Sequence, residues 1–159
     1  MKKILIVLGE GGHTTEMLNL VELLGNKYNY SYIVTKEDNL SANRIKFKGN
    51  IFRLNRPRGK TTNIFVSICI TILVLIKVIS IIRKILPNAI ISTGPAIVVP
   101  VAFIGKIFGV KIIFIETGSR VNTSSLTGKI MYKLADLFFI QWPNLKKRFP
   151  KAIYAGRLM

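Results

Sequence analysis

The sequence is poor in the residue types that stabilise small extracellular domains or bind metal ions. Its 159 residues include one cysteine and one histidine. A single cysteine excludes an intramolecular disulfide framework and agrees with a reducing compartment. With one histidine and no close group of acidic residues, the sequence also gives little support for a metal centre. We therefore predict no metal ion and no bound cofactor.

Acidic residues are also scarce and unevenly distributed. Seven Asp and Glu stand against 24 Lys and Arg, which gives a formal net charge of +17. The segment 40–115 has no carboxylate but twelve Lys and Arg, and it holds the longest apolar run. Basic and strongly apolar residues together favour an anionic membrane surface as a partner. No nucleic-acid partner is expected, because no nucleic-acid-reading module is recognisable.

Length and hydropathy limit the possible organisation. A chain of 159 residues with a mean hydropathy of +0.40 can bury a substantial core, and we interpret residues 1–159 as a single domain. The apolar run near the N-terminus is too short for the core of a signal peptide, so no cleaved leader is expected.

Short apolar runs alternate with polar turns and helical patterns along the chain. The runs predict strands at residues 3–8, 29–35, 51–54, 88–92, 111–115, 137–140 and 152–155. Intervening segments predict helices near 17–24, 61–86, 96–108 and 127–134, the last starting with Gly128. This alternation predicts an α/β fold with a Rossmann-like, doubly wound parallel sheet.

The first loop is the most distinctive motif. Residues 8–16 read LGEGGHTTE and join the first strand to the first helix. Gly9, Gly11 and Gly12 let backbone amides approach a ligand, and the helix N-terminus adds positive potential. We predict that this loop, including Thr14, binds an anionic group such as a phosphate. A tight turn that binds nothing is the alternative.

Two further polar turns follow predicted strands. Thr93 and Gly94 come after the strand 88–92, and Thr117, Gly118 and Ser119 come after the strand 111–115. In a doubly wound sheet, ligands bind beyond the carboxyl ends of the strands. Three polar turns at that edge predict one ligand site.

Two residues of these turns are candidate catalysts. His13 stands at the start of the first helix, where an imidazole can take a proton from an attacking hydroxyl. Glu116 ends an apolar strand, where it can bind sugar hydroxyls or act as a base. The alternatives are a structural hydrogen-bonding role for His13, and for Glu116 a cap or an ion pair with Arg120.

The spacing of the first loop argues against a dinucleotide site. Gly9 and Gly11 fit the opening of G-x-G-x-x-G, but Thr14 occupies the third glycine position. The missing third glycine weakens the dinucleotide alternative. It stays open, because Glu37 and Asp38 supply an acid after the second strand. The sequence has no G-x-x-x-x-G-K-[ST] loop.

The apolar helix expected at 61–86 is the second notable feature. Its charge-free part, residues 61–76, is shorter than the ~20 residues that span a bilayer, and a single crossing would separate strands of one sheet. We predict that its outer face enters the lipid interface; a fully buried core helix and a transmembrane span are the alternatives. The predicted membrane contacts are Arg56, Arg58, Lys60, Ile64, Phe65, Ile68, Ile72, Arg83 and Lys84.

Seven motifs together resemble a known family. They are residues 9–17, 92–95, 116–121, 126–129, 134–136, 141–143 and 154–156. Their order resembles that of the membrane-anchoring subunit of the split UDP-N-acetylglucosamine transferase of asparagine-linked glycan assembly. Bacterial relatives in capsule and exopolysaccharide clusters share this likeness.

The resemblance implies the N-terminal half of a GT-B glycosyltransferase. This half would contact a polyprenyl-diphosphate-linked sugar acceptor on the cytoplasmic face of the membrane, and a C-terminal half in trans would bind the UDP-sugar. By likeness, Gly11, Gly12, His13 and Glu116 belong to the acceptor site. The eukaryotic subunit carries an N-terminal anchor, so here the internal helix is expected to provide peripheral attachment. The alternatives are a soluble nucleotide-binding domain and a membrane interaction module without catalysis.

Overall fold

Within the described residues, seven parallel strands form one sheet. The computed structural model describes residues 1–55 and 64–158, with the backbone alone for residues 64–69. The strands are β1 (Lys3–Val7), β2 (Asn29–Thr35), β3 (Gly49–Leu54), β4 (Ala89–Ser92), β5 (Lys111–Ile115), β6 (Leu137–Ile140) and β7 (Ile153–Tyr154). Their order is β3-β2-β1-β4-β5-β6-β7, with parallel pairing throughout. The predicted doubly wound α/β sheet is confirmed.

The helices agree with the predictions except at two places. They are α1 (Gly12–Leu24), α2 (Asn39–Asn43), α3 (Ile64–Ile85), α4 (Val98–Ile107) and α5 (Leu126–Leu134), with 3-10 turns at Gly25–Lys27 and Pro143–Lys147. The short helix α2 lies where no helix or strand was predicted, and Asp38 caps it by accepting from Ser41 N at 2.8 Å. The start of α5 was predicted too late: Ser125 is its N-cap and accepts from Gly128 N at 2.7 Å.

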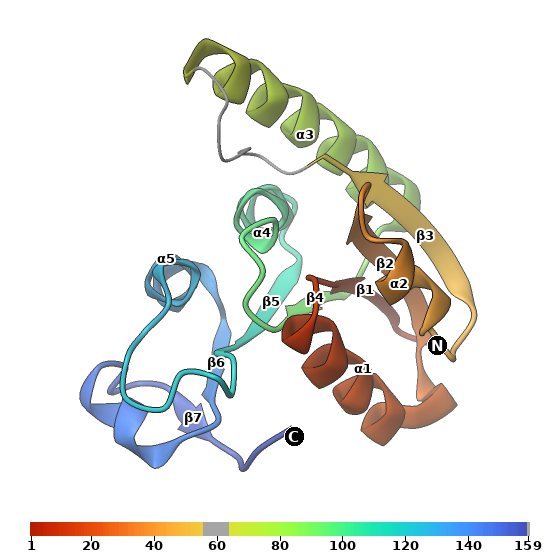
Figure 1. The fold of residues 1–159 in the computed structure, drawn as a ribbon. Coiled ribbons are helices and arrows are strands. Elements are labelled where there is room, and N and C mark those ends of the chain that lie inside the picture. Colours follow the sequence, from red (N-terminus) through yellow and green to blue (C-terminus); the bar gives the residue numbers. More distant parts are fainter. Residues whose placement is uncertain (56–63, 159) are drawn as a thin grey trace.

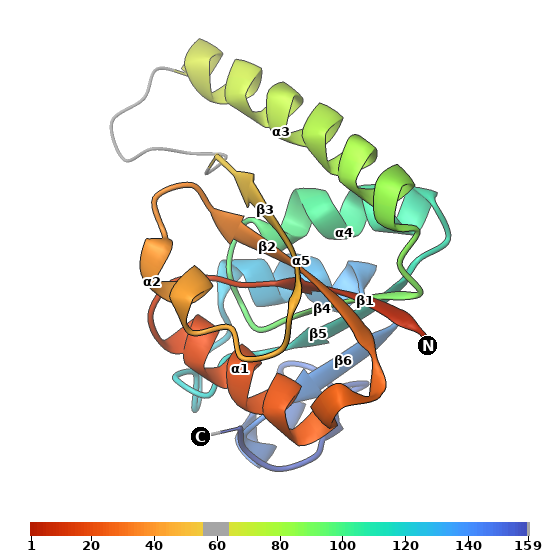
Figure 2. The same cartoon turned by 90° about the vertical axis from the view of Figure 1, so that its right-hand side faces the viewer.

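The helices cover the sheet on both faces, as Figures 1 and 2 show. Helices α3, α4 and α5 lie side by side on one face, and α1 lies on the other. On the first face Leu5, Val7 and Ile112 pack against these helices; on the second, Ile4 and Ile6 pack against α1. The alternating side chains of β1 therefore contribute to both cores.

Helix α3 is buried on one side only. Val74, Val78 and Ile82 are buried against the sheet, whereas Ile72 and Ile76 are half-exposed. The alternative of a fully buried core helix is therefore wrong for this chain. Among the described residues, no helix combines the length and apolar character needed to cross a bilayer.

The described structure covers only part of the predicted membrane contact. Arg83 and Lys84, in the last turn of α3, are exposed to solvent. Arg56, Arg58 and Lys60 lie outside the described residues, as do the side chains of Ile64, Phe65 and Ile68.

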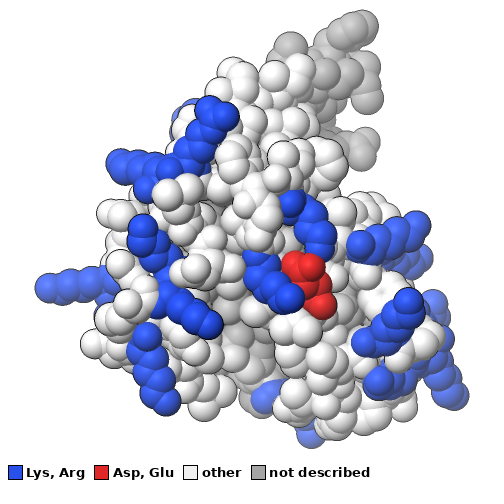
Figure 3. Space-filling model, turned by 180° about the vertical axis from the view of Figure 1, so that it is seen from behind, with Lys and Arg blue, Asp and Glu red and all other residues white. Residues whose placement is uncertain are grey.

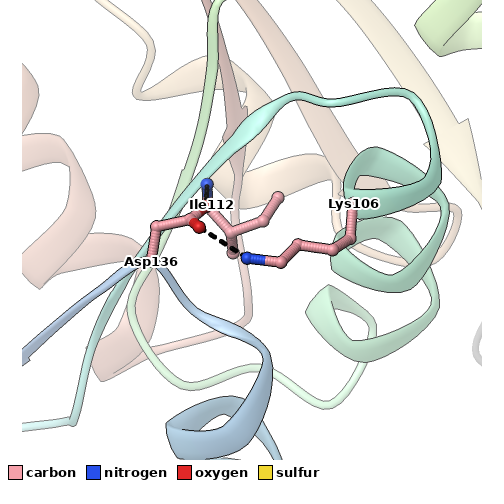
Figure 4. Close-up of polar contacts among 3 residues, drawn as sticks. All are labelled: Lys106, Ile112 and Asp136. Atoms are coloured by element: carbon pink, nitrogen blue, oxygen red, sulfur yellow. Dashed lines mark hydrogen bonds and ion pairs between the residues drawn. The ribbon is translucent and has the colours of Figure 1, made fainter.

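Basic side chains dominate the surface. Figure 3 shows many Lys and Arg on the face seen from behind, with acidic atoms in a single place. One acid with a structural role is Asp136, which accepts from Lys106 Nζ at 2.5 Å and from Ile112 N at 2.7 Å (Figure 4). Partial burial opposes ionisation of Asp136, but these two donors outweigh it and lower the pKa of the carboxyl. The contact joins α4, β5 and the start of β6.

Candidate functional site

A cavity opens at the carboxyl ends of the strands, between the first loop and helices α3, α4 and α5. Its volume is about 910 Å³, which is typical of small-molecule sites. Three loops supply its polar end, with Gly9, Glu10, His13, Thr35 and Gly94. The helices supply mainly apolar walls: Thr71, Leu75, Val99, Pro100, Phe103, Leu126, Thr127, Ile130 and Leu134, with Pro95, Ala96 and Ile97 before α4.

The glycines of the first loop have different structural requirements. A Cβ on Gly9 would lie 2.8 Å from the Pro95 side chain and 2.9 Å from His13 Cβ, so close packing requires a glycine there. Gly11 precedes α1 with φ +60°, and around Gly11 and Gly12 nothing lies within 4 Å of a Cβ position. Because the first amides of a helix lack intrahelical acceptors, the open backbone at Gly11 and Gly12 is suited to an anion.

His13 connects the first and second polar turns. Its ring packs directly on the α-carbon of Gly94, where a Cβ would lie 2.6 Å from Cε1 and 2.7 Å from Nδ1. The Thr93 hydroxyl donates to the carbonyl of His13 at 2.7 Å. His13 Nδ1 is buried and has no hydrogen-bond partner among the described residues. Packing against Gly94 therefore holds the ring at the polar end of the cavity.

Thr14 supports the loop from inside. Its hydroxyl donates to the carbonyl of Gly9 and lies 2.7 Å from the hydroxyl of Ser41 in α2. Ser41 also donates to the Gly9 carbonyl at 3.2 Å. Thr14 is fully buried, so its hydroxyl shapes the loop.

Glu16 is the central buried carboxylate, although the sequence did not single it out. One oxygen accepts from the Thr117 hydroxyl at 2.9 Å and from Gly118 N at 3.0 Å. The other accepts from Gln141 Nε2 at 3.1 Å. Glu16 is 1% exposed, and a buried carboxylate needs such donors to offset its lost hydration. It thereby ties α1 to the turns after β5 and β6.

Glu116 is buried in a different environment. Its carboxylate packs against the α-carbon of Gly128 at the start of α5, where a Cβ would overlap the Oε2 atom. In the part of the chain that the structure describes, neither oxygen has a partner with good hydrogen-bond geometry. Burial raises the pKa of Glu116, against smaller opposing effects of the Ser125 hydroxyl, the Thr117 backbone and the Arg120 charge. Glu116 thus requires a glycine at position 128.

The three predicted polar turns lie at one edge, because β1, β4 and β5 are neighbours. Gly9, His13 and Gly94 line the same cavity, whereas Glu116, Thr117, Gly118 and Ser119 do not. The roles predicted for these residues, and for Gly11, Gly12, Thr14 and Thr93, stay predictions.

At the polar end of the cavity, the sequence analysis missed Glu10 and Thr35, whose hydroxyl donates to Glu10 Oε1 at 3.0 Å. Both occupy strand-end turns, which was the available signal. Within the described ranges, no group of three His, Cys, Asp or Glu is placed to hold a metal ion.

Known sequences match the chain over almost all of its length. The family model described as "Oligosaccharide biosynthesis protein Alg14 like" matches residues 4–158. The human "UDP-N-acetylglucosamine transferase subunit ALG14" is 33% identical, over 98% of this chain and 82% of the human protein. The subunit of the same name from Schizosaccharomyces pombe is 32% identical, over 98% of this chain and 82% of its own length.

Solved structures share the fold at low sequence identity. MurG of Acinetobacter baumannii superposes with a TM-score of 0.78 at 14% identity, over 99% of this chain and 46% of MurG. The UDP-GlcNAc 2-epimerase of Methanocaldococcus jannaschii gives 0.74 at 13% identity, over 98% of this chain and 45% of the epimerase. The chain thus spans slightly under half of each protein, and the predicted half of a GT-B fold is confirmed.

The Glu16 contacts predict a large loss of stability when the carboxylate is removed. Glu16→Ala leaves a buried hydroxyl, a backbone N–H and an amide without their acceptor, so we expect it to lower the free energy of unfolding by roughly 3 kcal/mol. Denaturant titration measures this change. The matched control is Glu22→Ala on the same helix, where an exposed ion pair with Lys46 predicts a change below about 1 kcal/mol. Equal effects of the two substitutions would contradict the structural role of Glu16.

Glu116 predicts a stability that depends on pH. Its pKa is raised in the folded state from an ordinary value of 4.5, so the wild type loses stability as pH rises from 4.5 through the folded pKa. Glu116→Gln removes this titration. The free energy of unfolding of the variant, relative to that of wild type, should therefore be higher at pH 8 than at pH 4. Denaturant unfolding of both proteins at pH 4 and at pH 8 tests this prediction. The control is Glu37→Gln, because Glu37 is exposed to solvent. A pH-independent difference would contradict the raised pKa.

Proposed function

Because this chain belongs to the Alg14-like family of oligosaccharide biosynthesis proteins, we propose that it is one subunit of a heteromeric, membrane-associated glycosyltransferase. The relatives' names, which specify a transferase subunit, support this proposal. The fold supports it too, since the chain corresponds to under half of MurG. A partner subunit supplies the other half, with the UDP-sugar. The product is a lipid-linked oligosaccharide or a polysaccharide precursor.

The observation that carries this proposal is the cavity with a polar end and apolar walls. The first loop, whose Gly9, Glu10 and His13 line the cavity, holds the acceptor diphosphate at the N-terminus of α1, and the polar end holds the adjoining sugar. Gly11 and Gly12 leave open space beside this loop but do not line the cavity. A lipid-linked sugar diphosphate is the class of acceptor that suits both the polar end and the apolar walls of the cavity. The predicted nucleotide-binding domain is the weaker alternative, because the cavity walls are mainly apolar.

His13 is the proposed general base. In the transfer, the acceptor hydroxyl attacks the anomeric carbon of the UDP-sugar, the bond to the UDP oxygen breaks, and the hydroxyl proton passes to the imidazole. Packing on Gly94 fixes the ring of His13, and its Nδ1 atom is buried. We therefore assign Nε2 as the atom that accepts the proton. Glu116 does not line the cavity, and its contact with Gly128 favours a positioning role through α5.

The surface of α3, α4 and α5 is the proposed membrane contact. Ile72, Leu73 and Ile76 on α3 and Phe103 and Ile107 on α4 are each about half-exposed or more. Exposed basic residues flank them: Lys77, Arg83, Lys84 and Lys106. Apolar burial and attraction to anionic headgroups together support peripheral attachment at the cytoplasmic face. This orientation puts the cavity close to the lipid.

Transfer by the reconstituted pair tests the proposed activity. The chain is co-expressed with a UDP-sugar-binding half, and transfer from UDP-N-acetylglucosamine to a sugar diphosphate on a short polyprenol is measured. We expect transfer by the pair and none by either half alone. His13→Ala should lower kcat at least 100-fold while co-purification persists.

The control is Glu37→Ala, an exposed acid at the same edge that does not line the cavity and should leave kcat unchanged. Full transfer by the isolated chain would contradict the split enzyme, and unchanged kcat in His13→Ala would contradict the base.

Vesicle flotation tests the membrane surface. Ile72→Glu combined with Ile76→Glu places two charges on the outer face of α3, so we expect at least a tenfold loss of binding to vesicles that contain anionic lipid. Leu23→Glu is the control, because Leu23 is even more exposed to solvent, at 77%, but lies on α1 across the sheet. Equal vesicle binding by wild type, the α3 double variant and Leu23→Glu would contradict the proposed membrane contact.

A further inference from the structure

The cavity changes in chemical character along its length. Its end at the strand termini carries Glu10, His13 and Thr35, which can bind polar groups. Its other walls carry branched and aromatic side chains from three helices: Leu75 of α3, Val99, Pro100 and Phe103 of α4, and Ile130 and Leu134 of α5. A sugar or a phosphate placed between these apolar walls would lose its hydration without gaining donors. The helical part of the cavity is therefore suited to hydrocarbon.

The apolar walls continue to the protein surface. Phe103 is 52% exposed and Leu126 is 76% exposed, and both line the cavity as well. Helix α4 lies between α3 and α5 (Figure 1), so this rim is next to the helix that carries the half-exposed Ile72 and Ile76. A hydrocarbon chain can therefore run from the membrane-facing surface into the cavity along helical walls that are apolar except for Thr71 and Thr127.

We propose that the helical part of this cavity binds the first isoprene units of the acceptor lipid, next to its diphosphate. This inference rests on the proposed function and deepens it. The lipid chain leaves the bilayer and enters the protein between α4 and α5, beside Phe103 and Ile130. The diphosphate then lies at the first loop, and the sugar lies at the polar end beside His13.

This arrangement has a consequence for recognition. An acceptor held at the diphosphate alone can rotate about its phosphate bonds, whereas an acceptor held also by its lipid has one direction through the cavity. Lipid contact inside the protein therefore orients the reacting hydroxyl. It also makes affinity depend on the length of the isoprenoid chain, because each added unit buries more apolar surface.

Calorimetry with the full chain and water-soluble probes tests the proposal. The probes are inorganic diphosphate, dimethylallyl diphosphate with one isoprene unit, and farnesyl diphosphate with three. For wild type we expect farnesyl diphosphate to bind at least tenfold more tightly than dimethylallyl diphosphate. Phe103→Ser should remove most of this gain while leaving the affinity for inorganic diphosphate unchanged.

Phe108→Ser is the matched control. Phe108 follows the same helix, is 39% exposed and stacks with Arg83, but it does not line the cavity. The Phe108→Ser variant should still bind farnesyl diphosphate more tightly than dimethylallyl diphosphate, as wild type does. Leu126→Asn, at a position that is 76% exposed and so should cost little stability, provides a second cavity variant and should weaken farnesyl diphosphate binding several-fold.

Equal affinities of wild type for the two prenyl diphosphates would overturn the inference, and so would equal losses in Phe103→Ser and Phe108→Ser. If the reconstituted pair still transfers sugar in that case, the proposed function stands and only the isoprenoid site is wrong. If no diphosphate binds and the pair transfers no sugar, the proposed function fails as well.

Discussion

The buried carboxylate of Glu16 is the interaction on which this edge of the sheet depends. It accepts from Thr117, Gly118 and Gln141, which lie more than 100 residues away in the sequence. Burying a charge is costly unless donors replace the lost water, and here three donors from two segments do so. The first loop, at the N-terminus of the same helix, is consequently held in a fixed relation to β5 and β6. The first loop in turn forms the polar end of the cavity, together with Thr35 and Gly94.

Most of the fold was predictable because its signals are local. Apolar runs separated by polar turns indicate buried parallel strands, and the structure places all seven close to the expected positions. The short helix α2 was missed because five residues are too few for helical periodicity, and its stability depends on the cap at Asp38 and on Ser41 contacting the first loop. Such tertiary contacts have no periodic signature.

The candidate site was predictable in location but only partly in composition. Strand-end turns correctly indicated the edge where Gly9, His13 and Gly94 meet. Spacing alone cannot show whether a hydroxyl faces a ligand or a neighbouring carbonyl; Thr14 and Thr117 donate within the chain. Glu16 was missed because an acidic residue near the N-terminus of a helix is usually a surface residue that interacts favourably with the helix dipole. The apolar walls depend on how three helices pack, which no linear pattern specifies.

Amide hydrogen exchange measures the role of Glu16 most directly. In wild type the Gly118 amide, which donates to Glu16, should be protected. In Glu16→Ala, which removes the acceptor, we expect at least tenfold faster exchange at Gly118 and in the first loop, with a much smaller change in β2. Unchanged protection at Gly118 would contradict the conclusion that this carboxylate holds the site together.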